Sequence, residues 1–182
     1  PGPPYQPGAN DPAAVQAARK MGGNRFHPSQ PLEQRRYHAL MHQARTAEAV
    51  ALLRTILQAK PRDQFANHVL ATHLIRLGDL SAADRRLRIV LAGDPGNVAA
   101  RIMLANVWDR RQKFAEASAL LQAGLAGQPM NAALHLSLGA LCLTNAEFGR
   151  AEKHLQTARK LAPGNPALPA LFRQLETGPT DR

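Results

Sequence analysis

Aromatic residues and cysteine are both scarce in this sequence. Aromatic side chains make up 4% of its 182 residues, and Cys142 is the single cysteine. A disulfide framework is therefore excluded, because one thiol cannot form a bridge within the chain. The compartment stays open between cytoplasm and a periplasmic or envelope location. Nucleic-acid binding by successive stacking of bases on aromatic rings is disfavoured as well.

The chain also lacks an apolar run of membrane-helix length and a visible signal peptide. It begins at Pro1 without a methionine, so we expect a processed or excised form from which a leader, an anchor or further domains could have been removed. No G-x-S-x-G, Walker A or dinucleotide fingerprint is present. We therefore predict no enzymatic activity and no cofactor.

Acidic residues are few relative to basic ones. The sequence has 23 Lys and Arg against 13 Asp and Glu, a formal net charge of +10. One interpretation is attraction to an acidic partner, nucleic acid or an anionic membrane. The interpretation that we favour is a solvated, arginine-rich face. Six of the 23 basic residues lie in two short stretches: Arg85, Arg86 and Arg88, and Arg110, Arg111 and Lys113 in the next unit.

What the chain does have is a repeat of 34 residues. Prolines recur at this interval, and a good helix N-cap residue stands two places after each of them. The prolines are Pro61, Pro95, Pro129 and Pro163, and the caps are Asp63, Asn97, Asn131 and Asn165. Proline ends the preceding helix because it has no N–H to donate and disfavours helix in the residue before it.

Between the prolines, apolar and small residues keep the same phase, three and four positions apart as in helices. We call residues 34 positions apart a column. One column consists of leucines, the next position along the chain is always a small residue, and a second column of small residues lies further on. These columns are Leu70, Leu104 and Leu138; Ala71, Ala105 and Gly139; and Ala83, Ala117 and Ala151. Small side chains let two antiparallel helices approach closely. A single hairpin cannot bury its own apolar face, so the units must stack.

Helical hairpins of this length and pattern resemble the tetratricopeptide repeat (TPR). The matching residues are Leu138, Gly139, Trp108, Phe114, Phe148, Ala117, Ala151, Pro129 and Pro163. The family's early tryptophan is missing, and Asn67, Arg101 and His135 stand there instead. The resemblance implies an all-α fold, a right-handed α-solenoid of about four hairpins with a C-terminal capping helix.

The expected organisation has four parts. A Pro/Gly-rich flexible arm occupies 1–29, in which residues 12–21 could form a short helix but a flexible linker is favoured. The repeat array occupies 30–165, in units 30–63, 64–97, 98–131 and 132–165. The first unit is degenerate. We expect Asn165 to cap the final helix, 166–177, with Pro166 and Pro169 in its first turn, and a tail at 178–182.

In TPR stacks the first helix of each hairpin lines a concave groove. Phase within the repeat predicts the residues that line it here: Phe65, His68, Val69, Thr72, Arg76, Ile102, Met103, Asn106, Asp109, Arg110, Leu136 and Ala140. The apolar members would seat side chains of an extended peptide or an amphipathic helix. Asn106 would bond a peptide backbone, and the arginines a carboxylate. A chaperone-tail clamp is disfavoured, because Ser137 and Ala133 stand where further clamp residues would be needed.

We predict no metal site. His38 and His42 are four residues apart and could meet on one helix face, but zinc would need further ligands and none lies near in sequence. Cys142 falls on a core column, where a thiol usually behaves as a small apolar group.

The resemblance implies a scaffold that binds a protein or peptide, acidic if the net charge contributes, and that assembles a larger complex. Bacterial TPR proteins suggest secretion, pilus or envelope-assembly roles. Two alternatives stay open: the TPR region of a longer glycosyl- or sulfotransferase-like enzyme, and a basic adaptor for nucleic acid or anionic membrane. The sequence does not define the partner or the oligomeric state.

Overall fold

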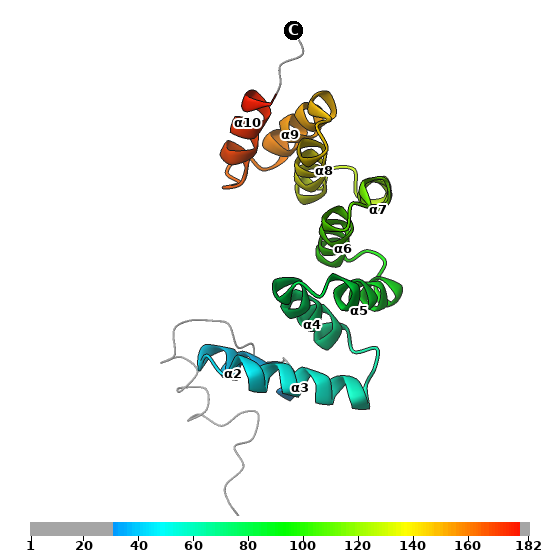
Figure 1. Ribbon diagram of the computed structural model, residues 1–182, viewed down its shortest axis with the longest axis vertical. Helices are drawn as coiled ribbons and strands as arrows, with labels where there is room; N and C mark the ends of the chain where they lie inside the picture. The colour runs from blue at the N-terminus through cyan, green and yellow to red at the C-terminus, as the bar shows by residue number, and fades with distance from the viewer. Residues whose placement is uncertain (1–30, 179–182) are drawn as a thin grey trace, which may run out of the picture. The chain divides into compact units, whose positions relative to one another are not determined.

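The computed structural model describes residues 31–178, and within that range it contains nine α-helices and no strand (Figure 1). The helices are α2 (Leu32–His42), α3 (Thr46–Ala59), α4 (Gln64–Leu77), α5 (Leu80–Gly93), α6 (Val98–Arg110), α7 (Phe114–Gly127), α8 (Ala132–Thr144), α9 (Phe148–Leu161) and α10 (Leu168–Thr177). The all-α helical-repeat prediction is confirmed. The possible helix at 12–21, the rest of the arm and residues 179–182 lie outside the described residues.

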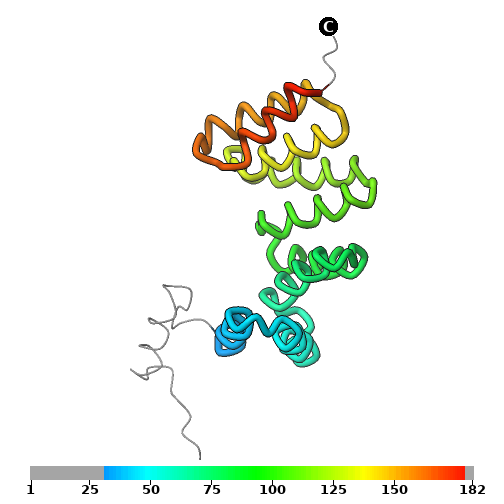
Figure 2. The backbone as a smooth tube through the Cα atoms, turned by 60° about the vertical axis from the view of Figure 1, so that its left-hand side comes forward, coloured from blue at the N-terminus to red at the C-terminus, as the bar shows by residue number. Residues whose placement is uncertain are grey.

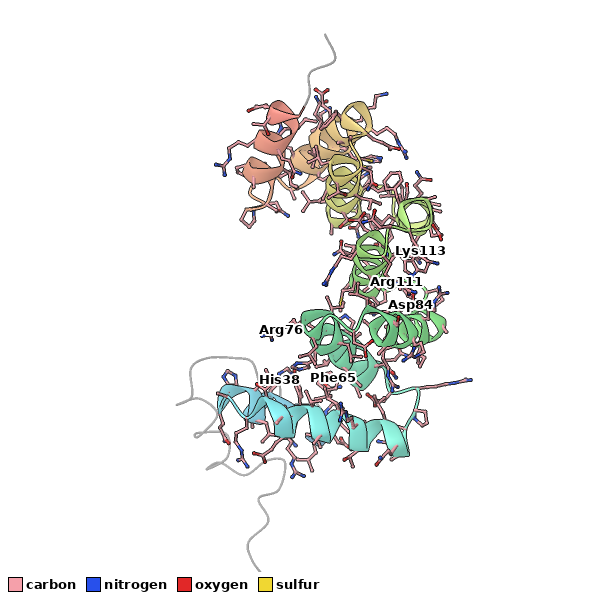
Figure 3. All side chains as sticks on the ribbon, in the orientation of Figure 1. His38, Phe65, Arg76, Asp84, Arg111 and Lys113 are labelled. Atoms are coloured by element: carbon pink, nitrogen blue, oxygen red, sulfur yellow. The ribbon has the colours of Figure 1, made fainter. Side chains whose placement is uncertain are left out.

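The chain divides between Ala59 and Lys60 into two compact units. In the first unit, α2 packs on α3, and Tyr37, Ala49 and Leu53 are buried. In the second unit, α4 pairs with α5, α6 with α7 and α8 with α9, and α10 packs on the last pair (Figure 2). The labelled arginine and lysine side chains of this second unit point to two different sides of it. In Figure 3, Arg76 projects on one side of it, and Arg111 and Lys113 on the other.

Three of the four expected N-caps are confirmed. Asp63, Asn97 and Asn131 each accept a hydrogen bond from a backbone amide three residues on, at 2.8, 2.9 and 3.2 Å. Each bond satisfies one of the free amides in the first turn of a helix, a contribution of about 1 kcal/mol to stability. These caps fix where the first helix of each hairpin in the second unit begins.

The prediction for the fourth cap is wrong. Helix α10 begins at Leu168, and the Asn165 side chain accepts instead from the amide of Ala167, which precedes the helix. A helix capped by Asn165 would place Pro169 where the first intrahelical N–H donor is needed. Proline has no such donor, so the helix begins later, with Pro169 inside a first turn that requires none.

The turn inside each hairpin repeats a left-handed residue that we did not predict. The residue after it donates its amide to a carbonyl five positions back, as from Asp79 to Leu74 at 3.0 Å and from Lys113 to Trp108 at 2.8 Å. This is the Schellman arrangement for ending a helix. The residues with positive φ are Ala44 (57°), Gly78 (82°), Gln112 (61°) and Ala146 (58°). They are also 34 positions apart, but only one of them is glycine.

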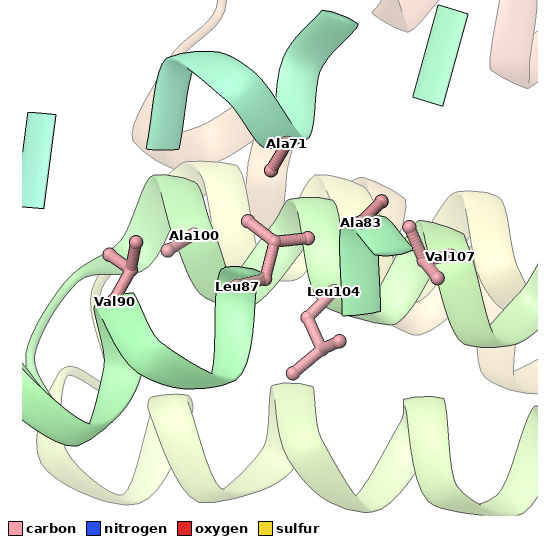
Figure 4. Close-up of a cluster of buried hydrophobic side chains, with 7 residues drawn as sticks. All are labelled: Ala71, Ala83, Leu87, Val90, Ala100, Leu104 and Val107. Carbon is pink, nitrogen blue, oxygen red and sulfur yellow. The ribbon is translucent and has the colours of Figure 1, made fainter. Parts of the chain in front are cut away.

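The core follows the predicted columns. Leu87 of α5 is fully buried in a cluster with Ala71, Ala83, Ala100 and other apolar residues of α4, α5 and α6 (Figure 4). In the last hairpin, a Cβ added to Gly139 would lie 2.6 Å from Leu155 Cδ2. The small columns therefore set how closely the two helices of a hairpin approach, and the neighbouring leucines fill the space beside each crossing.

A polar contact recurs where the family's early tryptophan is missing. Asn67 and Arg101 donate to the carbonyls of Pro61 and Pro95 at 2.9 and 2.6 Å, and the His135 ring nitrogen Nε2 lies 3.0 Å from the Pro129 carbonyl. Each side chain also contacts a residue of the second helix, 19 positions on: Arg86, Leu120 and His154. Polar side chains thus join the first turn of each hairpin to its second helix.

The last hairpin is covered by α10. Leu168 is buried, and Leu171, Phe172 and Leu175 pack against the core of α8 and α9. The Arg159 guanidinium lies 4.8 Å from the centroid of the Phe172 ring. The opposite side of α10 carries Arg173, Gln174 and Glu176, all exposed. Helix α10 therefore replaces an apolar surface with a polar one, as a terminal repeat requires.

Candidate peptide-binding face

The twelve residues predicted to line a groove come from α4, α6 and α8, the first helices of the three hairpins in the second unit. We call them together the first-helix face. None of the twelve is buried, whereas Leu70, Leu104 and Leu138 on the same helices are. Four are exposed, namely Thr72, Arg76, Asn106 and Arg110, and the other eight are half-buried. Helices α6 and α8 contact each other directly, which brings parts of this face together.

The apolar members of the face lie against the core. Met103 packs on the cluster formed by α4, α5 and α6, Ile102 on the next cluster, and Leu136 on the last. Each stays partly accessible to solvent. Such side chains are held in position by the core beneath them, and a guest side chain on their outer surface would remove further apolar area from water at about 25 cal/mol per Å².

Two polar members, Asp109 and Arg110, also join neighbouring hairpins. The Arg110 Nη1 atom donates to the carbonyl of Ile75, near the C-terminal end of α4, at 3.2 Å. The Asn145 side chain donates to Asp109 Oδ1 at 3.2 Å, and the Thr144 hydroxyl lies 3.4 Å from Asp109 Oδ2. The sequence interpretation did not foresee these structural contacts. Arg110 keeps further N–H donors for a ligand, since its guanidinium has five.

The other polar members differ in charge and environment. Burial lowers the pKa of His68, so this imidazole is neutral at pH 7 and adds no charge. The Thr72 hydroxyl donates to the His68 carbonyl at 3.2 Å. Arg76 and Asn106 are exposed and lie off the core columns. The exposed charged and amide side chains of the face are those of Arg76, Asn106 and Arg110, which can pair with carboxylates and with peptide backbone.

Other kinds of site find little support in the part of the chain that the structure describes. Residues 31–178 contain no group of three or more His, Cys, Asp or Glu placed to hold a metal ion. Cys142 is buried, and its desolvation raises the pKa of the thiol, which makes it less reactive. Among the described helices, none has the length and apolar character needed to cross a lipid bilayer.

Comparison with known proteins identifies the repeat. The sequence model of the tetratricopeptide repeat matches residues 85–142, from α5 into α8. Residues 85–142 are therefore similar to the tetratricopeptide repeat. No curated protein sequence matches this chain. The matched stretch includes members of the recurring small-residue columns, Ala105, Ala117 and Gly139.

Solved structures of other TPR proteins are similar to this one. A structure of MamA from Desulfovibrio magneticus, from residue 41 to its end, aligns with a TM-score of 0.62 and 17% identity, over 80% of this chain and 92% of the solved MamA chain. A thermophilic TPR protein from Thermus thermophilus aligns with a TM-score of 0.65 and 23% identity, over 79% of this chain and 80% of the Thermus chain. PilF from Pseudomonas aeruginosa gives 0.66 and 19%, over 79% of this chain and 65% of PilF. At these identities the similarity establishes the fold.

Proposed function

We propose that this TPR chain is a non-enzymatic scaffold that binds a peptide or an amphipathic helix of a partner protein on the first-helix face, and thereby helps to assemble a larger complex. The supporting observation is that all twelve residues of this face stay accessible on helices whose leucine and alanine columns are buried. Apolar side chains at Ile102, Met103 and Leu136 stand beside amide and guanidinium donors, the combination that peptide recognition uses.

Arg76 and Arg110 favour a partner that carries a carboxylate near its apolar side chains. The two guanidiniums lie on successive first helices, and Arg110 contacts the end of the helix that carries Arg76. A carboxylate held between them would accept charge-assisted hydrogen bonds, which are about twice as strong as neutral ones. The partner chemistry that fits this face is therefore an apolar segment with acidic residues.

Selection of peptides from a random displayed library tests this function, because such a selection requires no candidate partner. We expect selected peptides to lose about tenfold or more in affinity for the Met103→Glu and Asn106→Ala variants, measured by fluorescence anisotropy. Ala119→Glu on α7 and Ser81→Ala on α5 are matched controls at exposed positions of second helices. Binding that is equally weakened by the controls, or unchanged in both sets, would reject the first-helix face as the site.

A further inference from the structure

Trp108 is the centre of a polar contact between α5 and α6. Its indole N–H donates to Asp84 Oδ1 at 2.5 Å, and the Arg88 guanidinium lies over the ring, 5.0 Å from its centroid. Arg88 Nε also lies 3.1 Å from Asp84 Oδ2. The Asp84 side chain is 14% exposed, but that of Arg88 is 59% exposed. The stack therefore holds a cation in a fixed place at the surface.

The turn after α6 brings more cations to the same place. The backbone amides of Arg111 and Lys113 donate to the Trp108 carbonyl at 3.0 and 2.8 Å, so this turn lies beside the tryptophan. Both side chains are exposed, as is Arg85 on α5. In the view of Figure 3, Asp84, Arg111 and Lys113 lie on the side of the second unit away from Arg76 of the first-helix face. We call Arg85, Arg88, Arg111 and Lys113 the Trp108 cluster.

The acidic groups next to this cluster are already engaged. Asp84 pairs with Trp108 and Arg88, and Glu116 lies 3.6 Å from the Lys113 ammonium. Within residues 31–178, neither Arg85 nor Arg111 has a carboxylate within ion-pair distance. The cluster therefore keeps an excess of positive charge that nothing else in the described chain neutralises.

We propose that the Trp108 cluster is a second docking surface, for an acidic segment of a partner protein, separate from the first-helix face. Guanidinium groups match carboxylates in shape and charge, and Arg88 is already oriented by its stack. Single-stranded nucleic acid would need several free rings for stacking, and the ring beside this cluster, that of Trp108, is already covered by Arg88. An anionic membrane would gain only about 1 kcal/mol from each of these four cations, and the outward positions of α5, which are Ser81, Arg85, Arg88 and Ala92, add no apolar face.

The test uses Trp108 itself, since it is the only tryptophan in the sequence. A short Glu-rich peptide is titrated into the full chain, and intrinsic fluorescence and calorimetry follow its binding. We expect saturable binding that changes the Trp108 emission and weakens steeply as salt rises from about 50 to about 200 mM. A Lys-rich peptide of the same length should not bind.

Two charge-reversal variants locate the site. Arg85→Glu combined with Arg111→Glu should weaken the Glu-rich peptide by about tenfold or more. Lys153→Glu combined with Lys160→Glu makes the same change in net charge at exposed positions of α9 and should alter affinity by less than about twofold. Circular dichroism checks that both variants fold.

Several outcomes would overturn the proposal. Equal losses in the two double variants would show that the peptide responds to net charge alone. Duplex DNA or phosphatidylserine vesicles that bind more tightly than the peptide at equal salt, and that depend on Arg85 and Arg111, would assign the surface to another polyanion. Loss of peptide binding in Met103→Glu would place the site on the first-helix face instead.

Discussion

The Nδ1 atoms of His135 and His154 lie 3.1 Å apart and join α8 to α9. The His135 Nε2 atom is 3.0 Å from the Pro129 carbonyl, which can only accept, so Nε2 carries the proton and His135 Nδ1 accepts. His154 must then donate from its Nδ1. The hydrogen bond needs one proton between the two facing Nδ1 atoms, and a proton on each of them would place two N–H groups face to face.

This pair predicts that acid destabilises the last hairpin. Burial, and then the nearby His135 and Arg150, lower the pKa of His154 in the folded chain, so the unfolded chain binds a proton more readily. The contribution of His154 to the free energy of unfolding should be fully present above the unfolded histidine pKa of about 6.5. It should be lost as the pH falls below that value.

Urea unfolding between pH 8 and pH 5 measures this effect. His154→Gln should reduce the dependence of the unfolding free energy on pH. His68 and His73 also have pKa values lowered by burial, so some dependence should remain. If the unfolding free energy of His154→Gln depended on pH as strongly as that of the unchanged chain, the pair would not couple folding to pH.

Because the turn residues have positive φ, replacing alanine by glycine at one turn and glycine by alanine at another should change stability in opposite directions. Ala146 has φ of 58°, a conformation that costs a non-glycine residue about 1–2 kcal/mol, whereas glycine loses about 0.5–1 kcal/mol more conformational entropy on folding. Ala146→Gly should therefore stabilise the chain by about 0.5–1 kcal/mol. Gly78→Ala should destabilise it by a similar amount, although a Cβ there would meet nothing within 4 Å. Chemical denaturation checks both, and changes of the same sign would refute the assignment.

The close approach of α8 and α9 predicts that Gly139→Ala destabilises the chain. The added methyl would lie 2.6 Å from Leu155 Cδ2, and relieving this overlap should cost about 1–3 kcal/mol. Gly149→Ala is the matched control, because it lies in α9 with nothing within 4 Å of the new Cβ. There the better helix propensity of alanine should stabilise by about 0.5–1 kcal/mol. Thermal unfolding of both variants gives the comparison, and a neutral Gly139→Ala would mean that the crossing can widen freely.

Asn97 and Asn165 occupy equivalent positions of the repeat, but replacing them by alanine should reduce the unfolding free energy by different amounts. Asn97→Ala should cost about 1 kcal/mol, since the Asn97 side chain satisfies the Ala100 amide at the start of α6. Asn165→Ala should cost less, because its partner amide belongs to the turn before α10. Unfolding free energies in urea test the difference. Equal losses would indicate that the turn at Asn165 matters as much as a helix cap.

Features of the fold that depend on the chemistry of a particular side chain could be predicted from the sequence. Proline, N-cap asparagine and the small residues at helix crossings each have a chemical reason for their place. The left-handed position was missed because Gln112 and Ala146 share no side-chain property that marks it, although its spacing of 34 was there to find. The start of α10 differs from the prediction by two residues, because a helix from 166 would need an N–H donor at Pro169.

The candidate site was predictable only as a set of positions. Helical phase identified residues of the first helices that lie off the core columns. It could not show that Arg110 reaches the Ile75 carbonyl or that Asn145 reaches Asp109, because these contacts join residues 35 and 36 positions apart in different hairpins. Nor could it show the Trp108 stack, whose partners Asp84 and Arg88 lie in the preceding hairpin.

The most direct test of the proposed function is amide chemical-shift mapping of the full chain with a selected peptide. Binding on the first-helix face predicts the largest shifts at Arg76 on α4, at Met103 and Asn106 on α6, and at Ala140 on α8, with small shifts on α7 and α9. Shifts confined to second helices, or spread evenly over the chain, would contradict the account.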